Sequence, residues 1–404
     1  MGIVSYFPRW KRCVFNILAL LTTIPGQAVG SPIEATPNPT LDAIRQKHHL
    51  PGLVAARIQG RHHNHAAIIA QVAGVRKFGN DTKMTTSDTF HLGSLTKAMT
   101  ATLIALLISD PQNGLGWNTT VSEALPHLTG IAPEHGSTSL SMLAAHRAGF
   151  NDTALILQDV PLWIAIANGT YTLTEGRRLI AERAFASKPI TSPGSSYLYS
   201  NLGYMVLGHL VDVHYQDGGW ERFIREQLWN PLGMKDCGLG PVPQETPESI
   251  TNPWPHLPGN PDPVPVPPDT DLPSVMGPAG TAHCTIGSYA KFLSLHLDAI
   301  LGRETSFLPP SAFHVLHTPY STLAGSPLTG GVGDIYTPGG WLLVPDDGVN
   351  GQYLLHDGTN SMNYAWALVV PGRNESYFIA TNVGGADQAM SDVAERLFAG
   401  TLGL

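Results

Sequence analysis

Near both ends of the chain, hydrophobic positions alternate with polar ones or form short apolar runs, whereas the middle shows helical spacing. Near the amino end, "LPGLVAARIQG" and "AAIIAQVAGVRKFG" flank the polar segment "RHHNH", and this pattern predicts a β-hairpin. Near the carboxyl end, strand-like segments return in "GGWLLVP", "QYLLHDG", "NYAWALVVP" and "SYFIATNVG". The last segment, "DQAMSDVAERLFAGTL", predicts a closing helix.

Helical periodicity dominates from Ser94 to about Leu239, in "SLSMLAAHRAGF", "RRLIAERAFA" and "LGYMVLGHLVDVHYQ". A further helix is predicted in "SYAKFLSLHLDAIL". Proline breaks helices and interior strands, so the proline-rich residues 253–273 predict a long extended loop packed over one face. Strands at both ends with helices between them predict one sheet with an inserted helical subdomain.

Length and composition agree with a compact globular protein. The 404 residues are 43% hydrophobic and only 13% charged, which suits a large core. We expect one domain over residues 41–404, with a sheet subdomain at 41–92 and 284–404 and a helical subdomain at 93–283. The net charge of −8 provides no basic surface for nucleic acid. Motifs for zinc fingers, HExxH metalloproteases and phosphate loops are absent, so we expect no metal or cofactor.

The first 30 residues have the order of a secretory signal. Basic residues at positions 9, 11 and 12 precede the apolar run Cys13–Ile24, and Pro25 and the small-residue site Ala28-Val29-Gly30 follow. We therefore expect secretion, with no membrane attachment after cleavage and a mature net charge of −11. An uncleaved anchor is the alternative, although about twelve apolar residues are short for a membrane span.

Other features bear on an exported protein. The mature chain keeps only Cys237 and Cys284, which could form one disulfide if their geometry allows it. His62, His63 and His65 lie in the hairpin connection, where a solvated tip is favoured over a metal site. N-glycosylation sequons occur at Asn80, Asn118, Asn151, Asn168 and Asn374.

Ser94 and Lys97 stand three residues apart where a helical segment begins, in "HLGSLTKAMTATLIALL". Ser94 could be a helix cap, since serine is a favoured N-cap residue. It could also be a nucleophile, because residues i and i+3 share a helix face and a buried lysine with a lowered pKa can act as a base. The spacing alone is weak evidence, because "SYAK" repeats it at Ser288 and Lys291.

Two further segments favour the nucleophile. Tyr199 and Asn201 follow a turn signal in "PGSSYLYSNLGYMVLGHL", where a tyrosine near a lysine could shuttle a proton and an amide could bind a substrate carbonyl. His356-Asp357-Gly358 ends a predicted strand in "QYLLHDG". A glycine at a strand edge allows a ligand to approach free amides that could bind an oxyanion.

The order SxxK, YxN and [KH]xG resembles that of the penicillin-recognising serine hydrolases, in particular the branch of class C β-lactamases, D-alanyl-D-alanine carboxypeptidases and related esterases. The resemblance covers roughly Leu50 to Gly385 and includes "LAAHRAGF", "PLGM" and "MGPAGTAHCTIGSYAKFL". It implies an α/β fold of the β-lactamase/transpeptidase type: a mostly antiparallel sheet flanked by helices, plus an all-α subdomain, with the site between them.

The resemblance also implies roles for individual residues. Ser94 would be the nucleophile, Lys97 its activating group and Tyr199 the general base and acid. Asn201 would position the substrate, and His356 occupies the third-motif position. The amides of Ser94 and Thr359, next to Gly358, would form the oxyanion hole. His146 in "AHRAGF" would be structural, and Ser288 would have no catalytic part.

The sequence departs from the family pattern at Asp357, where a threonine or serine hydroxyl usually helps hold a substrate carboxylate. If Asp357 faces the cleft, its charge disfavours carboxylate-bearing substrates. We therefore expect a secreted serine hydrolase that acts through an acyl-enzyme on a small neutral ester, lactone or amide. An acyltransferase or transesterase of the same fold, and a non-catalytic penicillin-binding-like module, are the alternatives, and the oligomeric state stays open.

Overall fold

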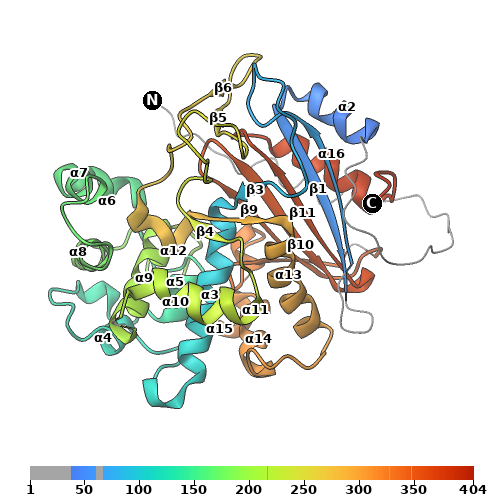
Figure 1. Ribbon diagram of the computed structural model, residues 1–404. Helices are drawn as coiled ribbons and strands as arrows, with labels where there is room; N and C mark the ends of the chain where they lie inside the picture. Colours follow the sequence, from blue (N-terminus) through green and yellow to red (C-terminus); the bar gives the residue numbers. More distant parts are fainter. Residues whose placement is uncertain (1–37, 61–66, 216, 327, 347) are drawn as a thin grey trace.

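The computed structural model describes residues 38–60, 67–215, 217–326, 328–346 and 348–404 (Figure 1). Its centre is a six-stranded sheet in the order β2-β1-β11-β10-β9-β8, with every neighbouring pair antiparallel. This sheet, with many helices around it, confirms the predicted mixed α/β class. Its strands are β1 (Gly52–Gln59), β2 (Ile68–Gly74), β8 (Leu342–Val344), β9 (Tyr353–Thr359), β10 (Tyr364–Val370) and β11 (Glu375–Thr381).

Strands from near the two ends of the chain are neighbours in this sheet, because β1 pairs with β11 in the register Leu53 opposite Thr381. The predicted hairpin is present as β1 and β2. β10 is buried along its whole length, since it lies in the middle of the sheet and both of its faces are covered. This explains why "YAWALVV" is continuously apolar rather than alternating.

Helices cover both faces of the sheet (Figure 1). On one face, α2 (Pro39–Lys47) and α16 (Asp387–Phe398) bury Leu41 and Met390 in a cluster with outward-facing side chains of β9 to β11. On the other face, α3 (Thr96–Ser109) and α13 (Ile286–Ile300) contribute to the largest core cluster. Alternate residues of each strand therefore enter two separate cores.

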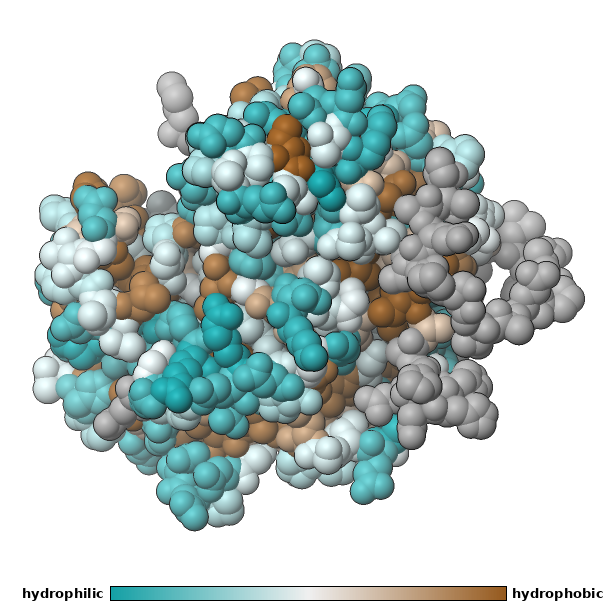
Figure 2. All heavy atoms as spheres, in the orientation of Figure 1, coloured by the Kyte–Doolittle hydropathy of each residue, from teal (hydrophilic) through white to brown (hydrophobic). Residues whose placement is uncertain are grey.

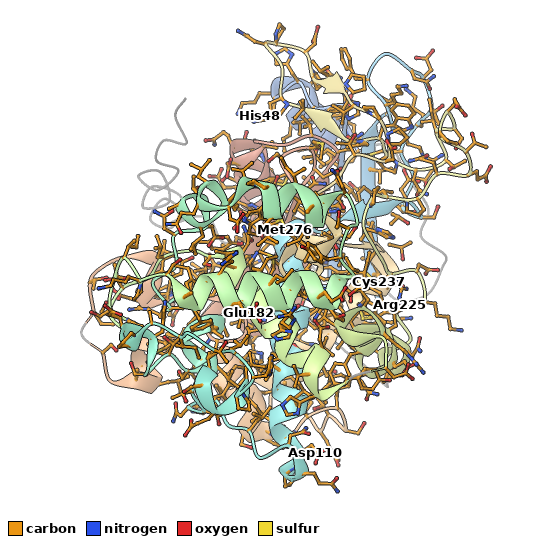
Figure 3. The ribbon with its side chains drawn as sticks, turned by 90° about the vertical axis from the view of Figure 1, so that its left-hand side faces the viewer. His48, Asp110, Glu182, Arg225, Cys237 and Met276 are labelled. Carbon is orange, nitrogen blue, oxygen red and sulfur yellow. A yellow bond between two sulfur atoms is a disulfide. The ribbon has the colours of Figure 1, made fainter. Side chains whose placement is uncertain are left out.

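The middle of the chain forms the helical part, which lies in the foreground of Figure 3. Buried Arg177 ties three of its helices together, because its guanidinium donates to Asp212 at 2.7 and 2.8 Å and to Glu221 at 2.6 and 2.8 Å. The helices are α4 (Val121–Ala124), α5 (Leu140–Ala144), α6 (Asp152–Gln158), α7 (Val160–Ala167), α8 (Leu173–Ala186), α9 (Asn201–His214), α10 (Gly219–Ile224), α11 (Asn230–Leu232) and α12 (Gly277–Gly280). Two short helices follow α13, namely α14 (Pro310–His317) and α15 (Tyr320–Ala324).

The proline-rich residues 253–273 run mostly without regular structure, as predicted, but include a two-stranded ribbon of β5 (His256–Leu257) and β6 (Val264–Pro265). A second small sheet has the order β3-β7-β4, from β3 (Thr89–His91), β7 (Ala282–Thr285) and β4 (Gly238–Leu239). A disulfide joins Cys284 of β7 to Cys237, which directly precedes β4, so the pairing that the sequence left open is present.

The surface is mixed in polarity on the face shown in Figure 2. The most exposed large apolar side chains of the described helical part include Leu157 of α6 at 68%, Ile190 at 58% and Ile164 of α7 at 55%. In the described part of the chain, no helix has the length and apolarity needed to cross a membrane.

Candidate active site

Ser94 lies in a single 3₁₀ turn, Gly93–Leu95, directly before α3. Its hydroxyl makes no capping bond to the helix, so the helix-cap interpretation is wrong. The hydroxyl oxygen lies 2.9 Å from Nζ of Lys97 and accepts a hydrogen bond from the hydroxyl of Tyr199 at 2.6 Å. The structure therefore brings together the three residues that the first two motifs predicted.

Lys97 is completely buried, and its amine has three oxygen neighbours. Besides Ser94, Nζ contacts Oδ1 of Asn201 and the carbonyl oxygen of Ala279, both at 2.7 Å. Burial lowers the pKa of Lys97 to about 7, although Asp152 and Asp357 oppose this shift. A neutral amine has two N–H donors and one lone pair. If the donors go to Asn201 and Ala279, the lone pair faces the Ser94 hydroxyl.

Tyr199 keeps its proton in this environment. Burial raises the pKa of its phenol well above the usual value, and the hydrogen bond to Ser94 only partly offsets this shift. The ring of His146 packs against the ring of Tyr199, with 4.3 Å between centroids. Tyr199 is therefore arranged as a proton donor to the Ser94 oxygen, while Lys97 is the group arranged to accept a proton.

Asn201 begins α9, and Asp152 holds this helix end in place. The carboxylate of Asp152 accepts hydrogen bonds from the Ser200 hydroxyl and the Asn201 amide, both at 2.6 Å. Asp152 is itself the first residue of α6, so it links two helices and supplies a counter-charge to Lys97. Sequence reasoning missed Asp152, because nothing local in "FNDTALI" indicates a partner 49 residues away.

His356 belongs to a buried hydrogen-bonded chain rather than contacting Ser94. Nδ1 of His146 accepts from the Ser200 amide, so its Nε2 carries the proton and donates to the hydroxyl of Tyr336 at 3.1 Å. Tyr336 then donates to Nε2 of His356 at 3.0 Å, and Nδ1 of His356 donates to the carbonyl of Asp357. Burial lowers the pKa of His356 to about 3, so the ring stays neutral and has no free nitrogen. Tyr336 in "GDIYTPGG" was not predicted.

The strand end at Gly358 and the turn at Ser94 are in close contact. A Cβ at Gly93 would lie 2.3 Å from the Thr359 amide nitrogen, and a Cβ at Gly358 would lie 2.8 Å from that of Ser94. Only residues without a side chain fit at these two positions. β8 pairs only with residues 353–355 of β9, so this neighbour leaves the end of β9 uncovered. The two predicted oxyanion-hole segments are thus adjacent.

Asp357 points away from these groups, which corrects its assignment as a substrate-binding residue. Successive side chains of β9 point to opposite faces, and His356 occupies the face of Ser94. The Asp357 carboxylate lies 3.3 Å from the hydroxyl of Tyr364, which donates to Asp387 at 2.6 Å. Asp387 is the first residue of α16.

Asp357→Asn should raise stability above about pH 6. Burial, with the nearby Asp387, raises the pKa of Asp357 to about 6, so ionising it opposes folding. The free energy of unfolding of the wild type should therefore fall by about 1–3 kcal/mol as pH rises from about 4 to above 6 and Asp357 ionises. Denaturant unfolding of both proteins at pH 5 and pH 8 measures the difference. Exposed Asp269→Asn is the control, and a pH-independent difference between Asp357→Asn and wild type would contradict the prediction.

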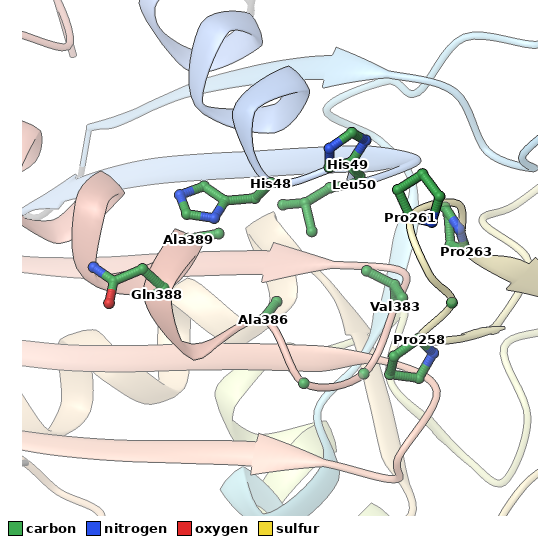
Figure 4. Close-up of a pocket in the computed structure, with 13 residues that line it drawn as sticks. His48, His49, Leu50, Pro258, Pro261, Pro263, Val383, Ala386, Gln388 and Ala389 are labelled. Carbon is green, nitrogen blue, oxygen red and sulfur yellow. The ribbon is translucent and has the colours of Figure 1, made fainter. Parts of the chain in front are cut away.

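The remaining sequence candidates lie elsewhere. Ser288 is buried on α13, accepts from the Asp236 amide at 3.2 Å, and its motif partner Lys291 is exposed and bonds to the Gly233 carbonyl. No group of three or more metal-binding side chains occurs among the described residues, which exclude His62, His63 and His65. A cavity of about 190 Å³ beside His48 and Pro258 includes no predicted catalytic residue (Figure 4).

Comparison with known proteins decides the family. The family model described as Beta-lactamase matches residues 38–400. The chain belongs to the Beta-lactamase family. Within this family, it is 27% identical to penicillin-binding protein 4 of Amycolatopsis lactamdurans over 369 residues, which cover 88% of this chain and 87% of that protein. It is 26% identical to the unguisins hydrolase of Aspergillus campestris over 71% of this chain and 51% of that protein.

Solved structures of other proteins share the fold. The octameric penicillin-binding protein homologue of Pyrococcus abyssi has a TM-score of 0.68 at 18% identity, over 89% of this chain and 75% of that one. The D-amino acid amidase of Ochrobactrum anthropi has a TM-score of 0.65 at 18% identity, over 89% of this chain and 98% of that one. The likeness confirms the predicted β-lactamase/transpeptidase-like fold, and with the family match it supports a serine hydrolase.

Proposed function

We propose that this chain is a secreted serine hydrolase that acylates Ser94 with a small neutral ester, lactone or amide. The observation that carries the proposal is the position of the Ser94 hydroxyl, 2.9 Å from the Lys97 amine and 2.6 Å from the Tyr199 hydroxyl. Both distances are within the range for direct proton transfer. A scaffold without catalysis would not need a buried lysine at this place, because burying an amine costs free energy.

In the proposed acylation, Lys97 takes the hydroxyl proton of Ser94 as the oxygen attacks the substrate carbonyl. The bond from Ser94 to the carbonyl carbon forms, and the carbonyl oxygen becomes an oxyanion facing the amides of Ser94 and Thr359. When the intermediate collapses, the bond to the leaving alcohol or amine breaks. Tyr199 donates its proton to that leaving group and regains one from Lys97. Water then attacks the acyl-enzyme carbonyl and gives a proton to Lys97, the ester bond to Ser94 breaks, and the Ser94 oxygen takes up a proton as the acid leaves.

The preference for neutral substrates rests on two features of the third motif. Asp357 replaces the hydroxyl residue that family members use to hold a substrate carboxylate. Its own carboxylate lies on the far side of β9 but is close enough to raise the pKa of Lys97, so it adds negative potential at the site. The D-amino acid amidase among the structural neighbours supports an amide as well as an ester.

A matched pair of esters tests the proposal. We expect p-nitrophenyl butyrate to be hydrolysed with a kcat/KM more than about tenfold above that of mono-p-nitrophenyl succinate, which adds a carboxylate at similar length. A fluorophosphonate should give one adduct by intact mass, and peptide mapping should place it on Ser94. Labelling elsewhere would contradict the nucleophile, and equal rates for the two esters would contradict the substrate class.

Secretion is part of the proposal, and it rests on residues 1–30 and on the sequons. The asparagines at 80, 118 and 168 are exposed, whereas those at 151 and 374 are partly buried and accept hydrogen bonds from Ala154 and Arg303. We therefore propose glycans at the three exposed sites. Amino-terminal sequencing of the exported protein and its mass loss on deglycosylation would test both points.

A further inference from the structure

Asp271 lies in the connection between β6 and α12, and its side chain is only 3% exposed. Its two carboxylate oxygens bind two different segments of the chain. Oδ2 lies 3.0 Å from Nε2 of His91, and Oδ1 accepts from the side-chain amide of Asn360 at 2.8 Å. These partners are three residues before Ser94 and one residue after Thr359.

The hydrogen bond between Asp271 and His91 positions the chain segment that precedes Ser94. Nδ1 of His91 accepts a hydrogen bond from the Gly93 amide at 3.1 Å. A neutral imidazole has one N–H, so that hydrogen is on Nε2 and donates to Asp271. Asp271 therefore fixes both the tautomer and the ring position of His91. Through the Gly93 amide, His91 then holds the 3₁₀ turn that contains Ser94.

The hydrogen bond between Asp271 and Asn360 positions the chain segment that follows Thr359. Oδ1 of Asn360 accepts from the amides of Met362 and Asn363 at 3.2 and 2.9 Å, which shapes the turn between β9 and β10. Its amide group is thereby oriented with the NH₂ towards Asp271. Asn360 is 3% exposed, and an exchange of its oxygen and nitrogen would leave these backbone donors without an acceptor.

We propose that Asp271 is a positioning residue that sets the spacing between the Ser94 and Thr359 amides. This inference rests on the proposed function, in which these two amides bind the oxyanion. Gly93 and Gly358 allow the two segments to touch, but they impose no distance on them. The carboxylate of Asp271 sets the distance between the two segments, because it is hydrogen-bonded to a residue of each. Donors of this kind stabilise an oxyanion only if they are held in place before the reaction.

Exchanging the two polar groups tests the proposal. Asp271→Asn still accepts from His91, but it turns an NH₂ towards the NH₂ of Asn360. Asn360→Asp places two carboxylates against each other. The double variant, with both exchanges, restores one acceptor for every donor. We expect each single variant to lower kcat for p-nitrophenyl butyrate by about 10- to 100-fold with KM changed less than about threefold, and the double variant to recover most of the loss.

A tetrahedral mimic separates this role from a merely structural one. Phenylboronic acid bound to Ser94 places an oxygen in the oxyanion hole, so its affinity should fall by the same factor as kcat and recover in the double variant. The pH midpoint of kcat/KM, which reports Lys97, should stay unchanged. Exposed Asp269→Asn is the control. Wild-type boronate affinity in Asp271→Asn, or a folded double variant without recovery, would overturn the proposal. A wild type without ester hydrolysis would instead refute the proposed function.

Discussion

Ser94→Ala should lower the hydrolysis of p-nitrophenyl esters by at least about 10³-fold. Removing the nucleophile removes the covalent route, and the residual rate then comes only from substrate binding and oxyanion stabilisation. The free energy of unfolding should change by no more than about 1 kcal/mol, because the Ser94 hydroxyl caps no helix. Steady-state kinetics and thermal melting of the purified variant measure both.

The chain contains a matched control for this experiment. Ser288→Ala removes the serine of the second SxxK spacing, whose hydroxyl contacts Asp236 and not the site. It should retain wild-type kinetics. Full activity in Ser94→Ala, or a loss confined to Ser288→Ala, would refute the assignment.

Local pattern was sufficient for most of the fold. Segments that alternate or run apolar predicted β1 and β2 as a hairpin, and a strand-like segment predicted β10. Pattern could not predict that the proline-rich segment contributes Asp271 to the neighbourhood of Ser94. The connection from residue 271 to His91 spans 180 positions, and only the folded chain brings the two together.

Family motifs predicted that Ser94, Lys97 and Tyr199 lie together, and the structure places them in contact. Asp357 shows where motif reasoning fails. Residues 356 and 357 are consecutive on a strand, so if His356 faces the nucleophile, Asp357 must face the opposite core. The strand prediction therefore contained the correction. Tyr336 and Asp152 are different, since neither lies in a motif and each acts through contacts made only in the folded protein.

Lys97→Ala and Tyr199→Phe should each lower kcat/KM by about 10²- to 10⁴-fold, the usual scale for groups that move protons. Lys97→Ala removes the only amine that contacts Ser94 in the described structure, and Tyr199→Phe removes the hydroxyl that donates to the same oxygen. Lys291→Ala and Tyr171→Phe, at exposed positions, are the controls and should keep wild-type rates.

The double variant tests whether the two groups share one proton path. If Lys97 accepts the Ser94 proton and passes a proton on to Tyr199, then removing either group stops the path, and removing both costs little more than removing one. Multiplied losses in the double variant would mean that they act independently.

The wild-type pH profile gives a second check, because only the neutral amine can act as the base. With the pKa of Lys97 lowered to about 7 by burial, kcat/KM for a neutral ester should rise with pH through a midpoint near 7. In Tyr199→Phe this midpoint should remain, since burial of Lys97 is unchanged, whereas Lys97→Ala should lose it. A wild-type profile that is flat from pH 5 to 9 would exclude Lys97 as the base.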